Sequence, residues 1–226
     1  MSGRRQSACT AFYGALPIFH ARRPLVLASA SPRRIAFFAE LGLTPTVLVP
    51  PPQAEPSPVR GEKPESYALR AALAKAAGAA MLPEYAAIRA ASPSAHPVVI
   101  AADTIVVLGR RILGKPRDAE HALDMLRRLA GKKHRVITGC ALLDNGTGRS
   151  FAVQSRVLMW DCPDELLRAY VSGGEPMDKA GAYAVQGVGA CLVQHIAGSW
   201  SNVVGLPLAE LVQTLLEINA IAPARS

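Results

Sequence analysis

Two short, wholly apolar runs constrain the fold of this chain most strongly. Leu25-Val26-Leu27-Ala28 and Val98-Val99-Ile100-Ala101-Ala102 contain no polar residue. Apolar segments of this length are typical of strands that are covered on both faces. Between them lie two segments of helical composition, 33–41, which stops at Gly42, and the alanine-rich 65–81. Because strands and helices alternate, we expect an α/β fold: a mixed, twisted sheet with flanking helices.

The rest of the chain continues this alternation. Residues 83–97 are rich in proline and small side chains and are interpreted as a connection or insertion. Gly109-Arg110-Arg111 predicts a hairpin. The further elements predicted are strands at 47–49, 135–143, 151–160 and 190–196 and helices at 118–129, 163–171 and 208–219.

Charge and hydropathy limit the kinds of partner that this chain can be expected to bind. The chain has 226 residues, half of them apolar, and a formal net charge of +8. Residues 1–23 contain four arginines and no acid, so the remainder has a net charge of +4. The basic residues do not alternate with aromatic side chains as in base-stacking platforms, and no apolar run approaches the roughly 18 residues of a membrane span. We therefore expect a site for a small polyanion, with no nucleic acid and no membrane as partner.

The cysteines and the N-terminus bear on location. None of the four cysteines belongs to a C-x-x-C pair, so no zinc or dithiol motif is indicated, and reduced thiols in the cytoplasm are expected. In the extension 1–23, two arginines precede an apolar stretch, as in a signal peptide. Arg22-Arg23 follow without a small-x-small cleavage site. We predict a disordered extension, with an organelle transit peptide as the alternative.

Ser29-Ala30-Ser31-Pro32-Arg33-Arg34 is the first candidate binding motif. It follows an apolar strand and begins a helix, where free N–H groups and the helix dipole favour an anion. Two arginines in this first turn are unfavourable unless an anion lies between them. Phosphate is the natural candidate, because helix N-termini and guanidinium groups both bind it. The alternative is a pair of solvated arginines on a surface helix.

Asp103 and Lys115 are the candidate catalytic pair. Asp103 stands where the second apolar run stops, and ligand sites of open α/β sheets gather at carboxyl ends of strands. Its carboxylate could hold Mg²⁺ or orient a water. Lys115, in Gly114-Lys115-Pro116, could reach toward Asp103 and neutralise phosphate charge. The alternatives are a turn aspartate and an ordinary turn.

A glycine-rich segment follows at 174–189. Gly174-Glu175-Pro176-Met177-Asp178-Lys179 would let backbone approach a ligand closely, and the Gln186 amide suits a base edge. The alternative is a surface turn. His134 has no His or Cys partner at ligand spacing, so it is interpreted as structural, as are Ser201 and Asn202.

Six motifs in order resemble the Maf family of nucleotide pyrophosphatases, which is associated with inhibition of septum formation. The likeness runs from about Leu25 to Leu216. The motifs are Ser29-x-Ser31-Pro32-Arg33-Arg34, Ala102-Asp103-Thr104, Gly114-Lys115-Pro116, His134-x-Val136-x-Thr138-Gly139, Asp178-Lys179-Ala180-Gly181-Ala182-Tyr183 and Asn202-Val203-Val204-Gly205-Leu206-Pro207-Leu208.

The resemblance implies one catalytic domain over 24–226 with two lobes around a cleft, similar to inosine triphosphate pyrophosphatases and often dimeric. It implies hydrolysis of a nucleoside triphosphate to a monophosphate and pyrophosphate. Asp103 matches the family's proton acceptor, Glu55 its second acidic residue and Lys115 its active-site lysine. The chain departs from the family where Gln53-Ala54 stand before Glu55.

Substrate choice is implied by three further positions, Arg33, Thr104 and Gln186. Arginine at 33 resembles the branch that acts on dTTP and UTP, whereas the branch acting on 7-methyl-GTP usually carries tryptophan there. We expect Mg²⁺ or Mn²⁺ on Asp103 and Glu55. The groups expected to hold the substrate are Ser29, Ser31, Arg33, Arg34, Thr104, Lys179 and Gln186.

Two other classes stay open. A nucleotide-binding regulator of cell division without turnover would use the same arginines, although it needs no water-activating carboxylate. A basic nucleic-acid-binding module lacks recognition motifs.

Overall fold

A mixed sheet forms the centre of the protein. The structure, a computed structural model, describes residues 17–52 and 56–224. The sheet has seven strands in the order β3-β2-β4-β6-β7-β8, with β5 paired to β4. The short β2 runs parallel to β3 and β4, whereas the pairs β4–β5, β4–β6, β6–β7 and β7–β8 are antiparallel. These strands are β2 Leu25–Leu27, β3 Thr46–Val47, β4 Val98–Leu108, β5 Arg111–Leu113, β6 Lys133–Asp144, β7 Thr147–Met159 and β8 Val193–Ala197. The predicted mixed α/β class is confirmed.

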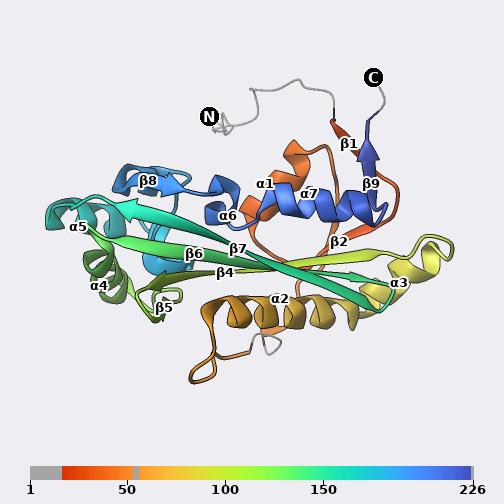
Figure 1. The fold of residues 1–226 in the computed structure, drawn as a ribbon, viewed down its shortest axis with the longest axis horizontal. Helices are drawn as coiled ribbons and strands as arrows, with labels where there is room; N and C mark the ends of the chain where they lie inside the picture. Colours follow the sequence, from red (N-terminus) through yellow and green to blue (C-terminus); the bar gives the residue numbers. More distant parts are fainter. Residues whose placement is uncertain (1–16, 53–55, 225–226) are drawn as a thin grey trace, which may run out of the picture.

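Helices cover both faces of this sheet (Figure 1). In that view α1 and α7 lie above the sheet, α2 lies below it, and α4 and α5 lie at its left-hand end. The helices are α1 Pro32–Glu40, α2 Pro64–Ala80, α3 Pro83–Ala91, α4 Ala119–Leu129, α5 Asp164–Ser172, α6 Trp200–Val204 and α7 Leu208–Glu217, with 3₁₀ turns η2 Glu175–Asp178, η3 Ala180–Ala182 and η4 Val188–Leu192.

The apolar run of β4 is buried on both faces, as its composition requires. Ile100 and Ala102 pack with Phe37 and Phe38 of α1 in one cluster. On the opposite face, Val99 and Ala101 pack against alanines of α2. Alternate residues of one strand therefore join two different cores, which is why the run contains no polar residue.

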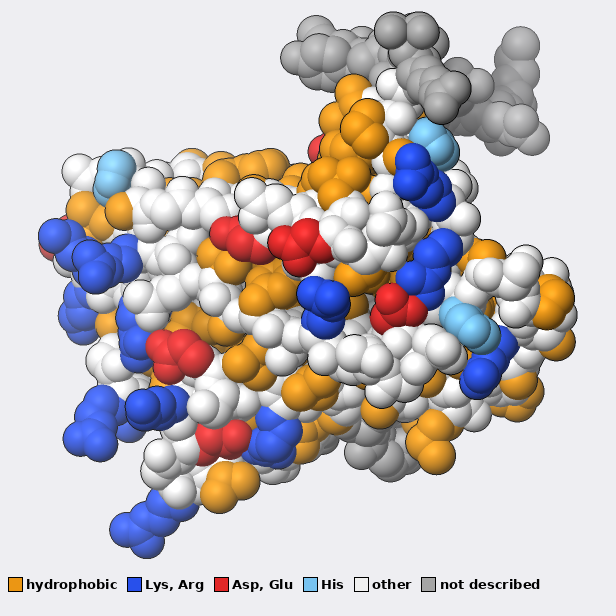
Figure 2. All heavy atoms as spheres, turned by 45° about the vertical axis from the view of Figure 1, so that its right-hand side comes forward, with side chains coloured by type: hydrophobic (Ala, Val, Ile, Leu, Met, Phe, Trp, Pro, Cys, Tyr) orange, Lys and Arg blue, Asp and Glu red, His pale blue; other side chains and the backbone are white. Residues whose placement is uncertain are grey.

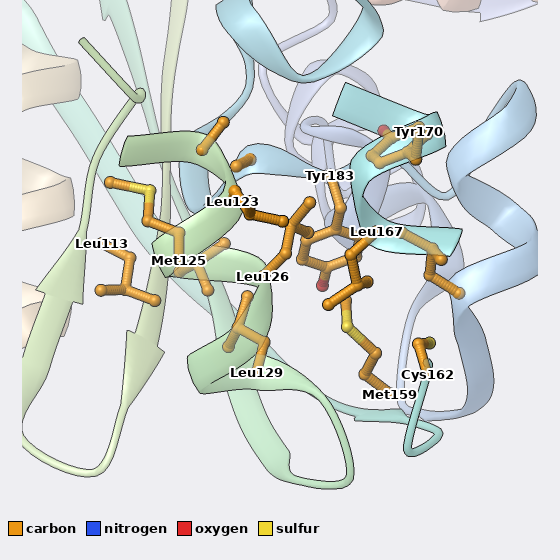
Figure 3. Packing of buried hydrophobic residues seen from close by; sticks show 14 of the residues in the cluster. Leu113, Leu123, Met125, Leu126, Leu129, Met159, Cys162, Leu167, Tyr170 and Tyr183 are labelled. Atoms are coloured by element: carbon orange, nitrogen blue, oxygen red, sulfur yellow. The ribbon is translucent and has the colours of Figure 1, made fainter. Parts of the chain in front are cut away.

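A third core lies at the α4 and α5 end of the sheet (Figure 3). Leu126 and Leu129 of α4 are fully buried with Leu167 of α5. Tyr183, from the segment after η3, inserts its ring into this cluster. The core thereby fixes the glycine-rich segment that follows η2.

Helix α2 lies unusually close to the sheet at Gly139 of β6. A Cβ added at Gly139 would lie 2.5 Å from the backbone carbonyl carbon and oxygen of Ala68. The alanines of α2 that face the sheet, at 68, 71, 72, 76 and 79, are fully buried. Small side chains on both elements allow this approach.

The structure corrects three expectations. Residues 83–91 form helix α3 instead of a connection; Pro83 suits the first helical turn and Glu84 the helix dipole. Asp103 lies inside β4, not at its end. At 19–21, within the predicted extension, β1 Phe19–Ala21 pairs with β9 Ile221–Pro223; the prediction for residues 1–16 lies outside the described residues.

Surface features agree with a site for a small ligand. On the face drawn in Figure 2, Lys and Arg side chains are interspersed with acidic and apolar ones and form no continuous stripe. Within residues 17–52 and 56–224, no helix is long and apolar enough to cross a membrane.

Candidate active site

The site forms at a gap along one edge of β4. Strand β2 pairs with β4 at 98–100, and β5 pairs with the same edge at 106–108. Between them, at 101–105, this edge has no neighbouring strand among the described residues. Asp103 and Thr104 lie in the middle of that gap. The chain after β2 turns away there into the Ser29–Ser31 loop, so the carboxyl end of β2, not of β4, opens the site.

A cavity of about 820 Å³ occupies this gap. Its walls come from the loop before α1, from α2, from β4 and β5, and from segment 178–186. Of the predicted site residues, it brings together Ser29, Ser31, Arg33, Arg34, Asp103, Thr104, Lys115, Lys179 and Gln186. Glu55 lies outside the described residues.

Asp103 forms an ion pair with Lys75 of α2. The Lys75 Nζ lies 2.5 Å from the Asp103 Oδ1, and Asp103 is 6% exposed. Lys75 lines the cavity with Asp103. Lys75 was not among the residues expected at the site, because a single lysine in an alanine-rich helix is usually a solvated residue. Its spacing of seven from Ala68, on the face that packs on the sheet, is the signal that could have identified it.

Arg34 is engaged by the protein itself. Its guanidinium donates to the carbonyl oxygens of Ala102 and Gly205 at 2.8 and 2.9 Å, and to Ser29 Oγ at 3.1 Å. It also donates to Thr104 Oγ1 at 3.2 Å. These contacts relieve part of the charge conflict expected at the start of α1. Arg34 thus ties the first loop to β4 and to the end of α6.

Arg33 takes a different direction from Arg34. Its Nη1 lies 3.8 Å from Asp178 Oδ2, and Lys179 forms an ion pair with the other carboxylate oxygen of Asp178. One acid therefore lies between two cations on the cavity wall. Burial raises the pKa of Asp178, but the contacts with Lys179 and Arg33 prevail and lower it overall. Arg33 and Lys179, which contact the Asp178 carboxylate here, could bind phosphate oxygens of a ligand in the same way.

The loop before α1 is held by its own serine. The Ser31 N–H donates to Ser29 Oγ at 3.2 Å, and Ser29 is almost fully buried. Ser31 is the N-cap residue of α1, and its side chain makes no capping bond. No acid stands in the first turn of α1. The helix N-terminus with Ser31 therefore faces the cavity with positive potential.

Lys115 and Gln186 also line the cavity. The Gly181 N–H donates to the Gly114 carbonyl at 3.0 Å, which fastens the Gly-Lys-Pro turn to η3. Lys115 lines the cavity beside Gly114. Gln186 is half-buried at the end of the same wall. Cations and an amide thus line the same cavity as Asp103.

His134 is buried in the core, which agrees with its interpretation as a structural residue. Its Nε2 is 2.7 Å from the Tyr183 hydroxyl, and it is 3% exposed. Burial lowers the pKa of His134 to about 4. It is therefore neutral near pH 7. Its contact with the Tyr183 hydroxyl helps to hold Tyr183, which lines the cavity.

The acidic groups of the site decide whether it suits a metal ion. Within the described residues, no group of three or more His, Cys, Asp or Glu side chains could enclose a metal. One buried carboxylate facing a cavity lined by cations fits a Mg²⁺ that one or two carboxylates and substrate phosphates share. Asp103 provides such a carboxylate, so the residues present fit a metal carried by a polyphosphate.

Comparison with known proteins identifies the family that this sequence matches. The sequence model of the family described as Maf-like protein matches residues 24–218. A dTTP/UTP pyrophosphatase of Nitratidesulfovibrio vulgaris is 52% identical over 204 residues, which cover 90% of this chain and 91% of that protein. One from Oleidesulfovibrio alaskensis is 44% identical over 211 residues, covering 91% and 90%. One from Desulfotalea psychrophila is 46% identical over 202 residues, covering 88% and 97%.

Proposed function

This chain belongs to the Maf family, and we propose that it hydrolyses dTTP and UTP to the nucleoside monophosphate and pyrophosphate. Relatives similar along nearly their whole length are named for that activity. The observation that carries the proposal is the buried Asp103–Lys75 pair in a cavity lined by further cations. A lone carboxylate would repel a triphosphate. When cations surround the carboxylate, their positive charge offsets this repulsion and the triphosphate can bind beside it.

Asp103 is the proton acceptor in this proposal. Lys75 holds Oδ1, so Oδ2 takes the proton of a water placed against the substrate. That water displaces pyrophosphate from the nucleoside monophosphate. Arg33, Lys115 and Lys179 stabilise the negative charge that grows on the phosphate oxygens and the leaving group.

Mg²⁺ or Mn²⁺ belongs to the proposal as a cofactor. Asp103, with Glu55 as the second carboxylate, would hold it. When bound, such an ion neutralises phosphate charge and acts as a Lewis acid.

Arg33, Thr104 and Gln186 make the substrate choice in this proposal. Gln186 offers both a donor and an acceptor to a pyrimidine edge. Thr104 is fixed by Arg34 and by Thr138, whose Oγ1 lies 2.9 Å from its own. Arg33 lines the cavity with Asp178 as its partner.

Pyrophosphate release from dTTP, UTP, CTP, GTP and 7-methyl-GTP, with and without Mg²⁺ or Mn²⁺, tests the proposal. Metal-dependent release from dTTP and UTP supports it. Release from 7-methyl-GTP alone keeps the chemistry and overturns the base assignment. Absence of release from every nucleotide by folded protein favours the regulator.

Location and assembly are part of the same proposal. A cytoplasmic enzyme fits the described cysteines, Cys140, Cys162 and Cys191, which are free thiols. A homodimer without a nucleic-acid partner is the expected assembly. Light scattering of the pure protein, with and without single-stranded DNA at low salt, measures both.

A further inference from the structure

The Glu175 carboxylate is saturated with hydrogen bonds from the segment that follows it. Its Oε1 accepts from the Tyr170 hydroxyl and from the Gly189 N–H, both at 3.0 Å. Its Oε2 accepts from the Val188 N–H at 3.0 Å. Burial, followed by the charge of Glu175, raises the pKa of Tyr170, so this hydroxyl stays protonated and donates. Glu175 is not among the described residues that line the cavity.

Two glycines shape the segment around this carboxylate. Gly187 has φ +82° and ψ −154°, a region open essentially only to glycine, and an added Cβ would lie 2.9 Å from Glu175 Oε2. At Gly189 an added Cβ would lie 2.5 Å from the Tyr170 hydroxyl and 2.6 Å from the Ala184 carbonyl oxygen. The backbone therefore folds tightly over the carboxylate.

That backbone carries Gln186 into the cavity. Ala184, Val185 and Gln186 line the cavity, and the two N–H groups bound to Glu175 follow within three residues. The Gln186 amide reads a base only if its donor and acceptor stay within about 2.7–3.2 Å of their partners. A shift of the segment by 1 Å removes such contacts.

Phosphate binding depends on a different part of Glu175. Lys179 Nζ donates to the Glu175 backbone carbonyl at 3.1 Å. A change of the Glu175 side chain leaves this carbonyl in place. The Glu175 carboxylate thus holds the segment that carries Gln186, whereas the Glu175 carbonyl holds Lys179.

We infer that Glu175 is a positioning residue for base selection: its carboxylate fixes the 184–189 segment and thereby the Gln186 amide. The inference rests on the proposed function and deepens it, because it says how the same cavity distinguishes one base from another. Glu175 acts through Gln186 and does not contact the substrate.

Glu175→Gln tests the inference with the smallest change of shape. The amide keeps one acceptor oxygen, and its NH₂ faces a hydroxyl or backbone donor. Loss of one hydrogen bond to a charged group corresponds to about a 10- to 100-fold effect. We expect the ratio of kcat/KM for dTTP to that for CTP to fall by this factor. Inhibition by inorganic tripolyphosphate, which has no base, should stay at the wild-type value.

Two variants frame the measurement. Tyr170→Phe removes one hydrogen bond but keeps the carboxylate charge and both backbone bonds and places no donor against a donor, so it should lower the same ratio by less. Glu165→Gln, a matched change at an exposed residue in the first turn of α5, should leave the ratio unchanged. Thermal unfolding of each variant shows that it is folded; if Glu175→Gln is not, Tyr170→Phe decides.

An equal loss on dTTP, UTP, CTP and GTP, together with weaker tripolyphosphate inhibition, overturns the inference. So does an unchanged ratio. If wild-type protein releases no pyrophosphate, the proposed function fails separately. Dissociation constants for dTTP and CTP in EDTA then decide: a wild-type preference that Glu175→Gln removes supports the inference, and no preference overturns it.

Discussion

Gly139→Ala should move helix α2 and disturb the ion pair between Lys75 and Asp103 without changing either residue. Gly139 is the strand partner of Asp103, and its Cα faces the backbone of α2. An alanine Cβ would stand 2.5 Å from the Ala68 carbonyl, whereas ordinary van der Waals contact begins at 3.4 Å. The helix must therefore shift by about 0.9 Å, the difference between these values. Backbone atoms cannot turn away as a flexible side chain does.

The magnitude follows from overpacking. Such insertions cost about 1–3 kcal/mol, and for a chain of this length each kcal/mol lowers the Tm by about 2–4 °C. We expect a Tm lower by roughly 2–12 °C. Lys75 is on the same helix, two turns beyond Ala68, and moves away from Asp103. Because a misplacement of 1 Å can cost about 100-fold in rate, kcat/KM for dTTP should fall by about 10- to 100-fold.

Calorimetry and pyrophosphate release at 25 °C measure the two effects. Gly148→Ala is the matched control, since its added Cβ would have Leu143 Cδ2 at 3.7 Å as its nearest neighbour and needs no shift. That variant should keep the wild-type Tm and kcat/KM. A Gly139→Ala protein with unchanged Tm would refute the packing argument. A lower Tm with unchanged kcat/KM would refute the link between helix position and catalysis.

Three further predictions follow from the site and its surroundings. Arg33→Trp should lower kcat/KM for dTTP and UTP by about 10-fold or more relative to 7-methyl-GTP; an unchanged substrate profile would argue against this assignment. Lys75→Met should lower kcat by about 100-fold and Lys75→Arg should recover part of it; wild-type kcat in Lys75→Met would exclude a role for the ion pair. Burial lowers the pKa of His134 from 6.5 to about 4, so the unfolded chain binds this proton first. The free energy of unfolding should therefore decrease by about 3 kcal/mol as the pH falls from 6.5 to 4. His134→Gln should flatten this dependence in urea titrations, and an equal slope in both proteins would contradict it.

The strands and most of the polar and charged residues that line the cavity could be predicted, because the signals that identify them are local in the sequence. The apolar runs before Ser29 and at 98–102 are buried strands, and the Gly109 hairpin is present. Nine of the ten expected site residues lie in the described part of the chain and line one cavity, and the tenth, Glu55, is outside it. Their roles stay predictions.

The parts that could not be predicted depend on distant partners. Asp103 was expected at a strand end because a polar residue breaks an apolar run, yet β4 continues to Leu108 since β5 and β6 pair with it. Lys75 becomes part of the site only because α2 packs on the sheet beside Asp103. Arg34 finds its carbonyl acceptors at residues 102 and 205, which no local pattern connects.

Asp103→Asn provides the most direct test of the proposed mechanism. The asparagine keeps the size of the side chain but cannot accept the proton of the attacking water. Pyrophosphate release from dTTP with Mg²⁺ should fall by about 100- to 10,000-fold, the usual contribution of a general base, while the Tm shows that the protein is folded. Near-wild-type release by folded Asp103→Asn would contradict the account.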